Sequence, residues 1–88
     1  MHESKLVTNL VDEAVRVAEL NSSDKVRDVT LSIGALSHVT PLSLESHMKD
    51  VAHGTLIADA TLTITKAIDP YAADALDVRL VSMKVGEG

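Results

Sequence analysis

The 88-residue sequence contains no cysteine, no tryptophan and no phenylalanine, and its only aromatic residue is Tyr71. The absence of cysteine excludes disulfides, thiolate zinc sites and cysteine nucleophiles. The core must therefore be built from Val, Leu, Ile and Ala, with Met48 and Met83 as gap fillers. Because these side chains bury less area than aromatic ones, we expect modest stability unless the chain self-associates, and a homodimer fits this composition.

The chain also lacks a basic cluster, and its net charge is −5. This charge argues against nucleic acid and against anionic membrane surfaces as partners. The sequence shows no signal-peptide-like segment and no long apolar run, so we expect a cytoplasmic protein with no membrane partner. The length fits a single domain spanning residues 1–88.

Hydrophobic periodicity predicts a first helix over residues 4–20, with Ser4 as a candidate cap. Its apolar residues follow the i, i+3, i+4 spacing of an amphipathic helix. They are Leu6, Val7, Leu10, Val11, Ala14, Val15 and Ala18.

A second helix is predicted over residues 41–52. Thr40 is suited to the N-cap, Pro41 to the first turn, and Gly54 to the C-terminal cap. The apolar residues of this helix are Leu42, Leu44, Met48, Val51 and Ala52.

Alternation of polar and apolar residues predicts three strands, over residues 25–33, 60–66 and 76–85. In the second strand, threonines occupy one face, and Leu62 and Ile64 occupy the other. In the third strand the apolar alternation changes phase after Leu80. One extra residue produces such a change, so we expect a bulge near Leu80 and Val81.

The expected order is helix, strand, helix, strand, strand, an α/β (α+β two-layer) fold. The first two strands flank a helix and should therefore be parallel, with a right-handed connection. The last two are separated by a short connection and are expected to pair antiparallel. The result is a three-stranded mixed sheet with both helices on one face and the threonine-bearing face open.

The first three residues, Met1-His2-Glu3, form a compact set of nitrogen donors. The terminal amine, the amides of His2 and Glu3, and a ring nitrogen of His2 lie within one short segment. Nitrogens in a plane suit Ni(II) or Cu(II) and suit Zn(II) or Mg(II) poorly. Because His2 is not small, Met1 should be retained during processing. Taken alone, a terminal segment of this kind is more often a solvated end without function.

Four parts of the chain together resemble a known family. They are Met1-His2-Glu3 followed at once by a helix, residues 31–39 with the pattern L-x-I-G-x-L-S-x-V, Gly54-Thr55 before a strand, and residues 81–85. The chain resembles the hydrogenase and urease nickel-incorporation metallochaperones of the HypA/HybF type. The resemblance spans almost the whole chain, and residues 33–39 are its most specific part.

The sequence departs from that family in two places. Family members insert a zinc domain with two Cys-x-x-Cys pairs between the last two strands, where this chain has only the short loop 67–75. No zinc is therefore expected. The second helix of the family brings aromatic residues to the core, where this chain has Ser46 and Met48. A natural short paralogue and a trimmed form of a longer protein are both compatible with these departures.

The resemblance implies that Ni(II) binds at Met1, His2 and Glu3, through the terminal amine, the His2 ring and backbone amides. It implies a carrier without enzymatic activity, whose partners are a nickel-handling GTPase and the precursor of a hydrogenase or urease. An alternative is a metal-free interaction module, a remnant of the family that no longer delivers nickel. The absent zinc domain favours this alternative, and the intact Met-His-Glu terminus opposes it.

The remaining histidines are weaker candidates. His38 follows the first strand in a loop expected near the N-terminus, which makes it the best further ligand. His53 and Asp50 are three residues apart and could share a helix face, although a solvated helix end is the more usual reading. Ser37, His38 and Asp50 lack the nucleophile elbow of a hydrolase, so no catalytic residue is expected.

Overall fold

The computed structural model of the protein describes residues 3–21 and 25–85. Two helices and three strands follow one another in the predicted order. They are α1 (Glu3–Leu20), β1 (Val26–Ile33), α2 (Pro41–Ala52), β2 (Thr61–Lys66) and β3 (Val78–Val85). Within the described residues, neither helix combines the length and the apolar character needed to cross a bilayer.

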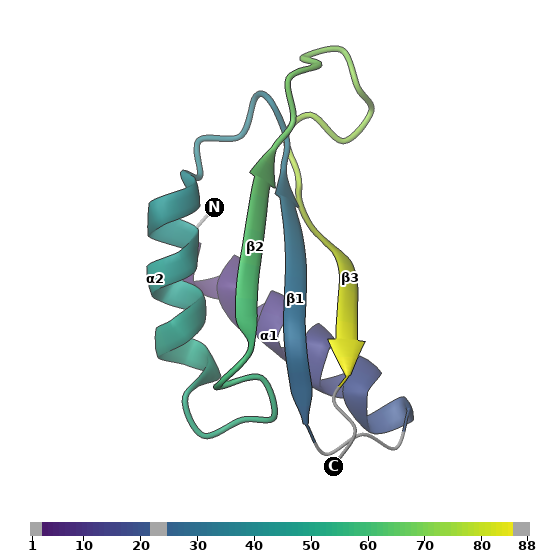
Figure 1. The fold of residues 1–88 in the computed structure, drawn as a ribbon. Helices are drawn as coiled ribbons and strands as arrows, with labels where there is room; N and C mark the ends of the chain where they lie inside the picture. Colours follow the sequence, from purple (N-terminus) through teal and green to yellow (C-terminus); the bar gives the residue numbers. More distant parts are fainter. Residues whose placement is uncertain (1–2, 22–24, 86–88) are drawn as a thin grey trace.

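The strands form one mixed sheet with the order β2-β1-β3, so β1 is its central strand. It runs parallel to β2 and antiparallel to β3. The expected antiparallel pairing of the last two strands is therefore wrong, because β1 lies between them. The central place suits β1, whose Val29, Leu31 and Ile33 are all fully buried. The connection of β2 to β3 extends to Asp77 and passes the end of β1 (Figure 1).

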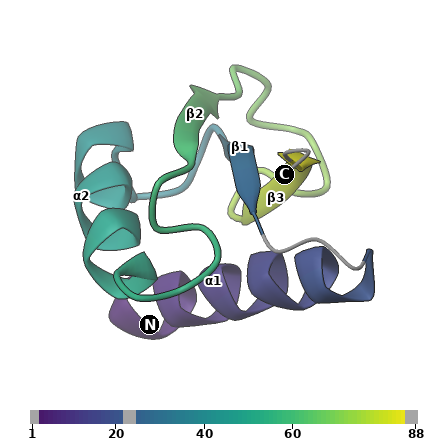
Figure 2. The same ribbon diagram turned by 60° about the horizontal axis from the view of Figure 1, so that its bottom comes forward.

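Both helices lie on the same side of the sheet, with α1 crossing behind it and α2 beside β2 (Figures 1 and 2). The stripe predicted for α1 forms much of the core, since Val7, Leu10, Val11, Ala14 and Ala18 are buried. The helix begins at Glu3, so Ser4 lies in its first turn and is not its cap. The carbonyl of Ser4 accepts a hydrogen bond from Thr8 Oγ1 at 2.9 Å.

The second helix has the predicted caps. The hydroxyl of Thr40 accepts from the Ser43 N–H at 3.2 Å, and Pro41 occupies the first turn. Beyond its end, Gly54 has φ +82°, a left-handed conformation that glycine adopts without strain. Leu44, Met48 and Ala52 face the core, whereas Leu42, another apolar residue of this helix, is 80% exposed. Leu42 lies in the first turn of α2.

The two faces of the sheet differ as the alternation predicted. On the helix side, Val29 is flanked by Leu62 and Met83, and Leu31 by Ile64 and Leu80. The opposite face is polar and lies open, and its nine residues form three rows across the sheet. These rows are Thr61-Asp28-Lys84, Thr63-Thr30-Ser82 and Thr65-Ser32-Arg79.

The pairing of β1 with β3 shifts register between Thr30 and Leu31. Thr30 lies opposite Ser82, and Leu31 lies opposite Leu80, which leaves Val81 as the extra residue. This is the bulge that the change of phase predicted. A second shift, between Val26 and Asp28, was not predicted.

Candidate metal site

The predicted ligands Met1 and His2 lie outside the described residues, and Glu3 is the first residue of α1. The structure therefore shows that an α-helix begins at the third of the three predicted ligands. The first N–H groups of an α-helix have no acceptor four residues earlier in the helix. The amide of Glu3 thus belongs to a position where the helix itself offers no partner, and a metal can replace its proton without breaking the helical ladder.

A hollow of about 420 Å³ lies beside the first turn of α1. It is bordered by Leu6 of α1, by the connection between β1 and α2, and by the residues that lead into β3. The lining residues are Leu6, Ser37, Val39, Leu76, Asp77, Val78 and Arg79. His38 lies between two of them in sequence and is exposed. Leu6 near the start of α1 and the neighbours of His38 therefore border the same hollow.

The segment before His38 is held by backbone hydrogen bonds to the residues preceding β3. Gly34 N–H donates to the Asp77 carbonyl at 2.7 Å, and Leu36 N–H donates to the Ala75 carbonyl at 2.8 Å. Only glycine allows the backbone at position 34 to approach the backbone at Ala75 this closely, because a Cβ at this position would lie 2.2 Å from the Ala75 carbonyl oxygen. The glycine of the motif thus lets the two segments touch.

Two further hydrogen bonds fix the residues around His38. Lys66 Nζ, at the end of β2, donates to the Ser37 carbonyl at 3.2 Å. The Ser37 hydroxyl accepts from the Val39 N–H at 3.2 Å, which closes a tight local turn. The Ser37 side chain therefore takes part in a local turn.

The other histidines are spread over the surface. His47 lies on α2 and His53 follows it, and both are exposed. The contact between His53 and Asp50 is a backbone one, from the His53 N–H to the Asp50 carbonyl at 3.4 Å. Within residues 3–21 and 25–85, no three His, Asp or Glu side chains lie close enough to hold a metal together.

The residues just before β3 were not predicted to line a hollow. The alternation placed the start of the strand at Leu76, but β3 begins at Val78 and Leu76 is 70% exposed. Arg79 Nη1 donates to Asp74 Oδ2 at 2.8 Å, and this hydrogen bond lowers the pKa of the Asp74 carboxyl. In the sequence, the only indication of this ion pair was the spacing of five residues between the oppositely charged Asp74 and Arg79.

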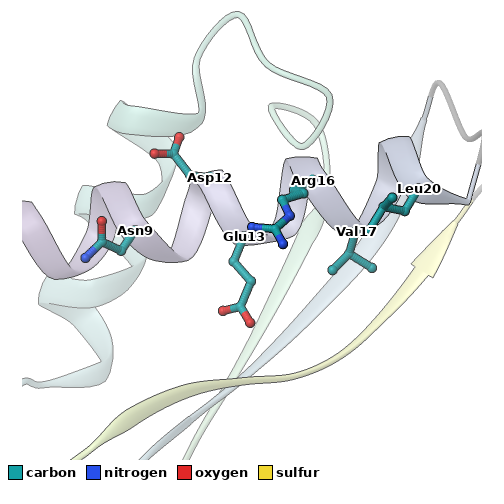
Figure 3. A pocket seen from close by; sticks show the side chains of 6 residues that line it. All are labelled: Asn9, Asp12, Glu13, Arg16, Val17 and Leu20. Carbon is teal, nitrogen blue, oxygen red and sulfur yellow. The ribbon is translucent and has the colours of Figure 1, made fainter.

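A second hollow, of about 460 Å³, lies along the outer flank of α1 (Figure 3). All its lining residues come from this one helix, and none is a histidine. They are Asn9, Asp12, Glu13, Arg16, Val17 and Leu20. Figure 3 shows the guanidinium of Arg16 on the same stretch of helix as the two carboxylates, so a cation bound there would meet a fixed positive charge.

Comparison with known proteins identifies a family whose model includes the first residues of the chain, and solved structures with the same fold. The family model described as "Hydrogenase/urease nickel incorporation, metallochaperone, hypA" matches residues 1–71. The hydrogenase maturation factor HypA of Rhizobium leguminosarum bv. viciae is 36% identical over 66 residues, which cover 75% of this chain and 58% of that protein. The HypA of Rhodopseudomonas palustris strain TIE-1 is 39% identical over 77 residues, covering 88% and 66%.

The solution structure of the Ni metallochaperone HypA from Helicobacter pylori has the same fold, with a TM-score of 0.81. Its sequence identity is 21%, and the superposition covers 97% of both chains. The chain spans 58% and 66% of the length of the two curated relatives above. The family consists of metallochaperones that serve as maturation factors and are not enzymes. With its family match over residues 1–71, this chain belongs to the HypA family of hydrogenase and urease nickel-incorporation metallochaperones.

Proposed function

We propose that this chain binds Ni(II) at its N-terminus and carries it to the precursor of a nickel enzyme, a hydrogenase or a urease. The ligands are the amine of Met1, the ring of His2, and the backbone amides of His2 and Glu3. The observation that carries the proposal is that the family match begins at residue 1 and so includes these three residues. The start of α1 at Glu3 supports it, because the helix begins within the proposed chelate.

The charge balance of this donor set suits the start of a helix. Ni(II) bound by a neutral amine, a neutral imidazole and two ionised amides has no net charge at the metal. A helix N-terminus carries a partial positive charge and would disfavour a cationic complex. The neutral complex avoids this penalty, and a planar arrangement of four nitrogens is one that Ni(II) favours.

The proposal implies a specific dependence on pH. The terminal amine, with an ordinary pKa of about 7.7–8.0, must lose its proton to bind, and two amides must ionise as the metal enters. Nickel affinity therefore rises with pH and is lost in mild acid. A carrier must also release its cargo, and protonation of the amine provides a simple route to release.

We further propose that residues 1–88 are one nickel-binding-type domain, with a short loop where longer relatives carry a zinc domain. The family match ends at residue 71, inside the connection between β2 and β3, whereas the superposition on the Helicobacter protein extends into β3. Additional residues inserted at this connection would account for the greater length of the relatives. The chain has no cysteine to supply thiolate ligands, so zinc has no part in the proposal.

His38 is the candidate for a further ligand. Its neighbours Ser37 and Val39 border the same hollow as Leu6, from the first turn of α1. His38 is exposed, so its ring can bind a metal without leaving a packed position. Replacing His38 tests this part of the proposal separately from His2.

The proposed partners are a nickel-handling GTPase and the nickel-enzyme precursor. The alternative function is a metal-free interaction module, and the observation that favours it is that the chain covers 58% of the Rhizobium relative. A module of this kind would keep the fold and its contacts with other maturation proteins without delivering nickel. The two functions differ in one measurable property, nickel binding that depends on His2.

The test is a Ni(II) titration of the untagged chain beside His2→Ala, followed by the visible absorption of planar nitrogen-coordinated nickel. We expect one nickel per chain and a loss in His2→Ala of at least about tenfold in affinity, or about 1.4 kcal/mol. Equal binding by the two proteins would overturn the carrier proposal and leave the interaction module.

Two controls locate the site. His53→Ala changes another exposed histidine, at the far end of α2, and should bind nickel like the wild type. Acetylation of the terminal amine leaves every side chain in place but should abolish the planar site, because an acetylated amine cannot act as a donor. A weaker effect of His38→Ala would assign His38 as an additional ligand, and no effect would remove it from the site.

A further inference from the structure

The two edges of the sheet differ in how they are protected from other strands. Edge strands usually carry charges, prolines or bulges that prevent pairing with another chain. The β3 edge has such features, with a bulge at Val81 and positive charges at Arg79 and Lys84. The β2 edge has one such feature, the charge of Lys66 at its end, and its other residues, 61–65, read Thr-Leu-Thr-Ile-Thr and pair with β1 without a register shift.

The backbone of β2 directs alternate residues toward the open edge. Ala67 N–H donates to the Ile33 carbonyl at 2.8 Å, which continues the parallel ladder with β1. Along a strand, successive residues direct their N–H and C=O groups to opposite sides. The groups of Thr61, Thr63 and Thr65 therefore face β1, and those of Leu62 and Ile64 face outward.

No described element continues the sheet beyond β2. The sheet ends there in the order β2-β1-β3, and α2 lies on the helix side of the sheet next to α1 (Figure 2). The outward groups of Leu62 and Ile64 thus form a short, regular row suited to accept another strand.

We propose that this edge binds a second copy of the same chain, with the two β2 strands antiparallel and a twofold axis at Thr63. The strand is self-complementary about this residue. The axis places Thr63 opposite Thr63, Thr61 opposite Thr65, and Leu62 opposite Ile64 of the partner. The threonine row and the apolar row each continue unbroken across the junction, which joins the two sheets into one six-stranded sheet.

The backbone geometry agrees with this register. Leu62 and Ile64 both direct their backbone groups outward, so they form hydrogen-bonded pairs on both sides of the axis. Thr63 then becomes a non-hydrogen-bonded pair, in which the side chains approach closely. A shift by one residue would place an outward group opposite an inward one, and it would exchange the two faces.

Charge complementarity supports the same register. Asp59 precedes β2 and Lys66 ends it, and both are exposed. With the axis at Thr63, Lys66 of one copy lies opposite Ala60 of the other, next to Asp59. Opposite charges thus meet at both ends of the junction, and its uncharged centre avoids repulsion between two chains that each carry −5.

The main test compares two lysine substitutions on the same row of the open face. Thr63 and Ser82 are both exposed, and both are register partners of Thr30, one from each side. Thr63→Lys places two like charges opposite each other across the proposed axis, whereas Ser82→Lys places its charge on the protected edge. Sedimentation velocity measures how much of the 9.4 kDa monomer is converted to dimer as the protein concentration rises. A chelator is present in the buffer, so that no metal ion can bridge two N-termini.

We expect the wild type and Ser82→Lys to dimerise with the same affinity. Thr63→Lys should dimerise with an affinity at least roughly tenfold lower. Circular dichroism will show whether Thr63→Lys keeps the fold. A wild type that stays monomeric at millimolar concentration, or equal effects of the two lysines, would overturn the proposal. A failure to dimerise would not affect nickel binding by the monomer, so the dimer proposal and the nickel proposal are tested independently.

A cross-linking test does not depend on the charge variants. The natural chain has no cysteine, so a single introduced thiol can form a disulfide only with another copy. In the proposed dimer, the two residues at position 63 are about 4.5 Å apart between Cα atoms, within the range that a disulfide spans. Under mild oxidation, Thr63→Cys should form a covalent dimer faster than Thr65→Cys and Ser82→Cys. Equal rates for the three variants would show random collision and contradict the twofold axis at Thr63.

Discussion

Gly34→Ala should destabilise the fold through a steric conflict between two backbone segments. Gly34 is the glycine of the family motif, and a Cβ there would lie 2.2 Å from the Ala75 carbonyl oxygen and 2.5 Å from that of Asp74. Real Cβ atoms essentially never approach other atoms closer than 3.0 Å, so the Ala75 oxygen must retreat by at least 0.8 Å. The retreat strains the hydrogen bond from Gly34 N–H to Asp77 and the one from Leu36 N–H to Ala75.

The magnitude follows from these two effects. Overpacking costs typically about 1–3 kcal/mol, and a weakened backbone hydrogen bond costs about 1 kcal/mol. Because Leu76 and Asp77 are exposed, the segment can move and relieve part of the conflict. We therefore expect Gly34→Ala to lower the free energy of unfolding by about 2–3 kcal/mol, measured by urea denaturation followed by far-UV circular dichroism.

Gly54 provides the matched control, because it is needed for a different reason. Its φ is +82° and a Cβ there would meet nothing within 4 Å, so the cost at Gly54 is backbone strain of about 1 kcal/mol. Asparagine tolerates this conformation better than alanine, and it is larger. At position 54 asparagine should be the milder change, whereas at position 34 alanine should be the milder one. If Gly34→Ala changes stability by less than about 0.5 kcal/mol, the steric argument is refuted.

Three further predictions concern the core, a helix cap and a surface ion pair. Met48→Ala should cost about 2–5 kcal/mol in the free energy of unfolding because Met48 is fully buried, whereas Met48→Leu should cost less than about 1.5 kcal/mol. Thr40→Ala removes the acceptor of the Ser43 N–H and should cost about 1 kcal/mol by denaturation, while Thr40→Asp should retain the cap. Arg79→Gln should raise the pKa of Asp74 toward its ordinary value of 3.8 in an NMR titration of the carboxyl. Because pairing with Arg79 lowers the pKa of Asp74 in the folded state, the pair stabilises the fold above the unfolded pKa, and this stabilisation is lost as pH falls through the folded pKa.

The elements of the fold were largely predictable because each has a strong local pattern. The stripe on α1, the caps of α2 and the alternation in β2 all reflect interactions within a few residues of one another. The bulge at Val81 was also predictable, since an extra residue shifts the side-chain alternation by one. The error at Leu76 falls at the start of a strand, where the alternation of the sequence continues but the side chain is exposed.

The order of the strands was not predictable from local pattern. Residues 29–33 alternate in the same way as residues 61–65, so nothing in the sequence marks β1 as the strand that pairs on both sides. That choice depends on the connection from Ala67 to Asp77, which passes the end of β1 and brings β3 to its far side. Strand order is thus set by contacts distant in sequence, which alternation does not encode.

The motif of residues 33–39, on which the resemblance to the family most depends, mainly concerns the fold, and His38 is the only nickel ligand proposed within it. Ile33 fills the core, Gly34 admits the Ala75 carbonyl, and the Ser37 hydroxyl closes a turn with the Val39 N–H. Each of these residues has a structural task that a protein without bound metal would also require. Retention of the motif therefore establishes the architecture for both proposed functions equally. Only Met1-His2-Glu3 distinguishes them, because these residues carry the proposed nickel donors. The decisive measurement on nickel binding is therefore made at the terminal amine and His2, whereas substitutions of Ile33, Gly34 or Ser37 would test folding instead.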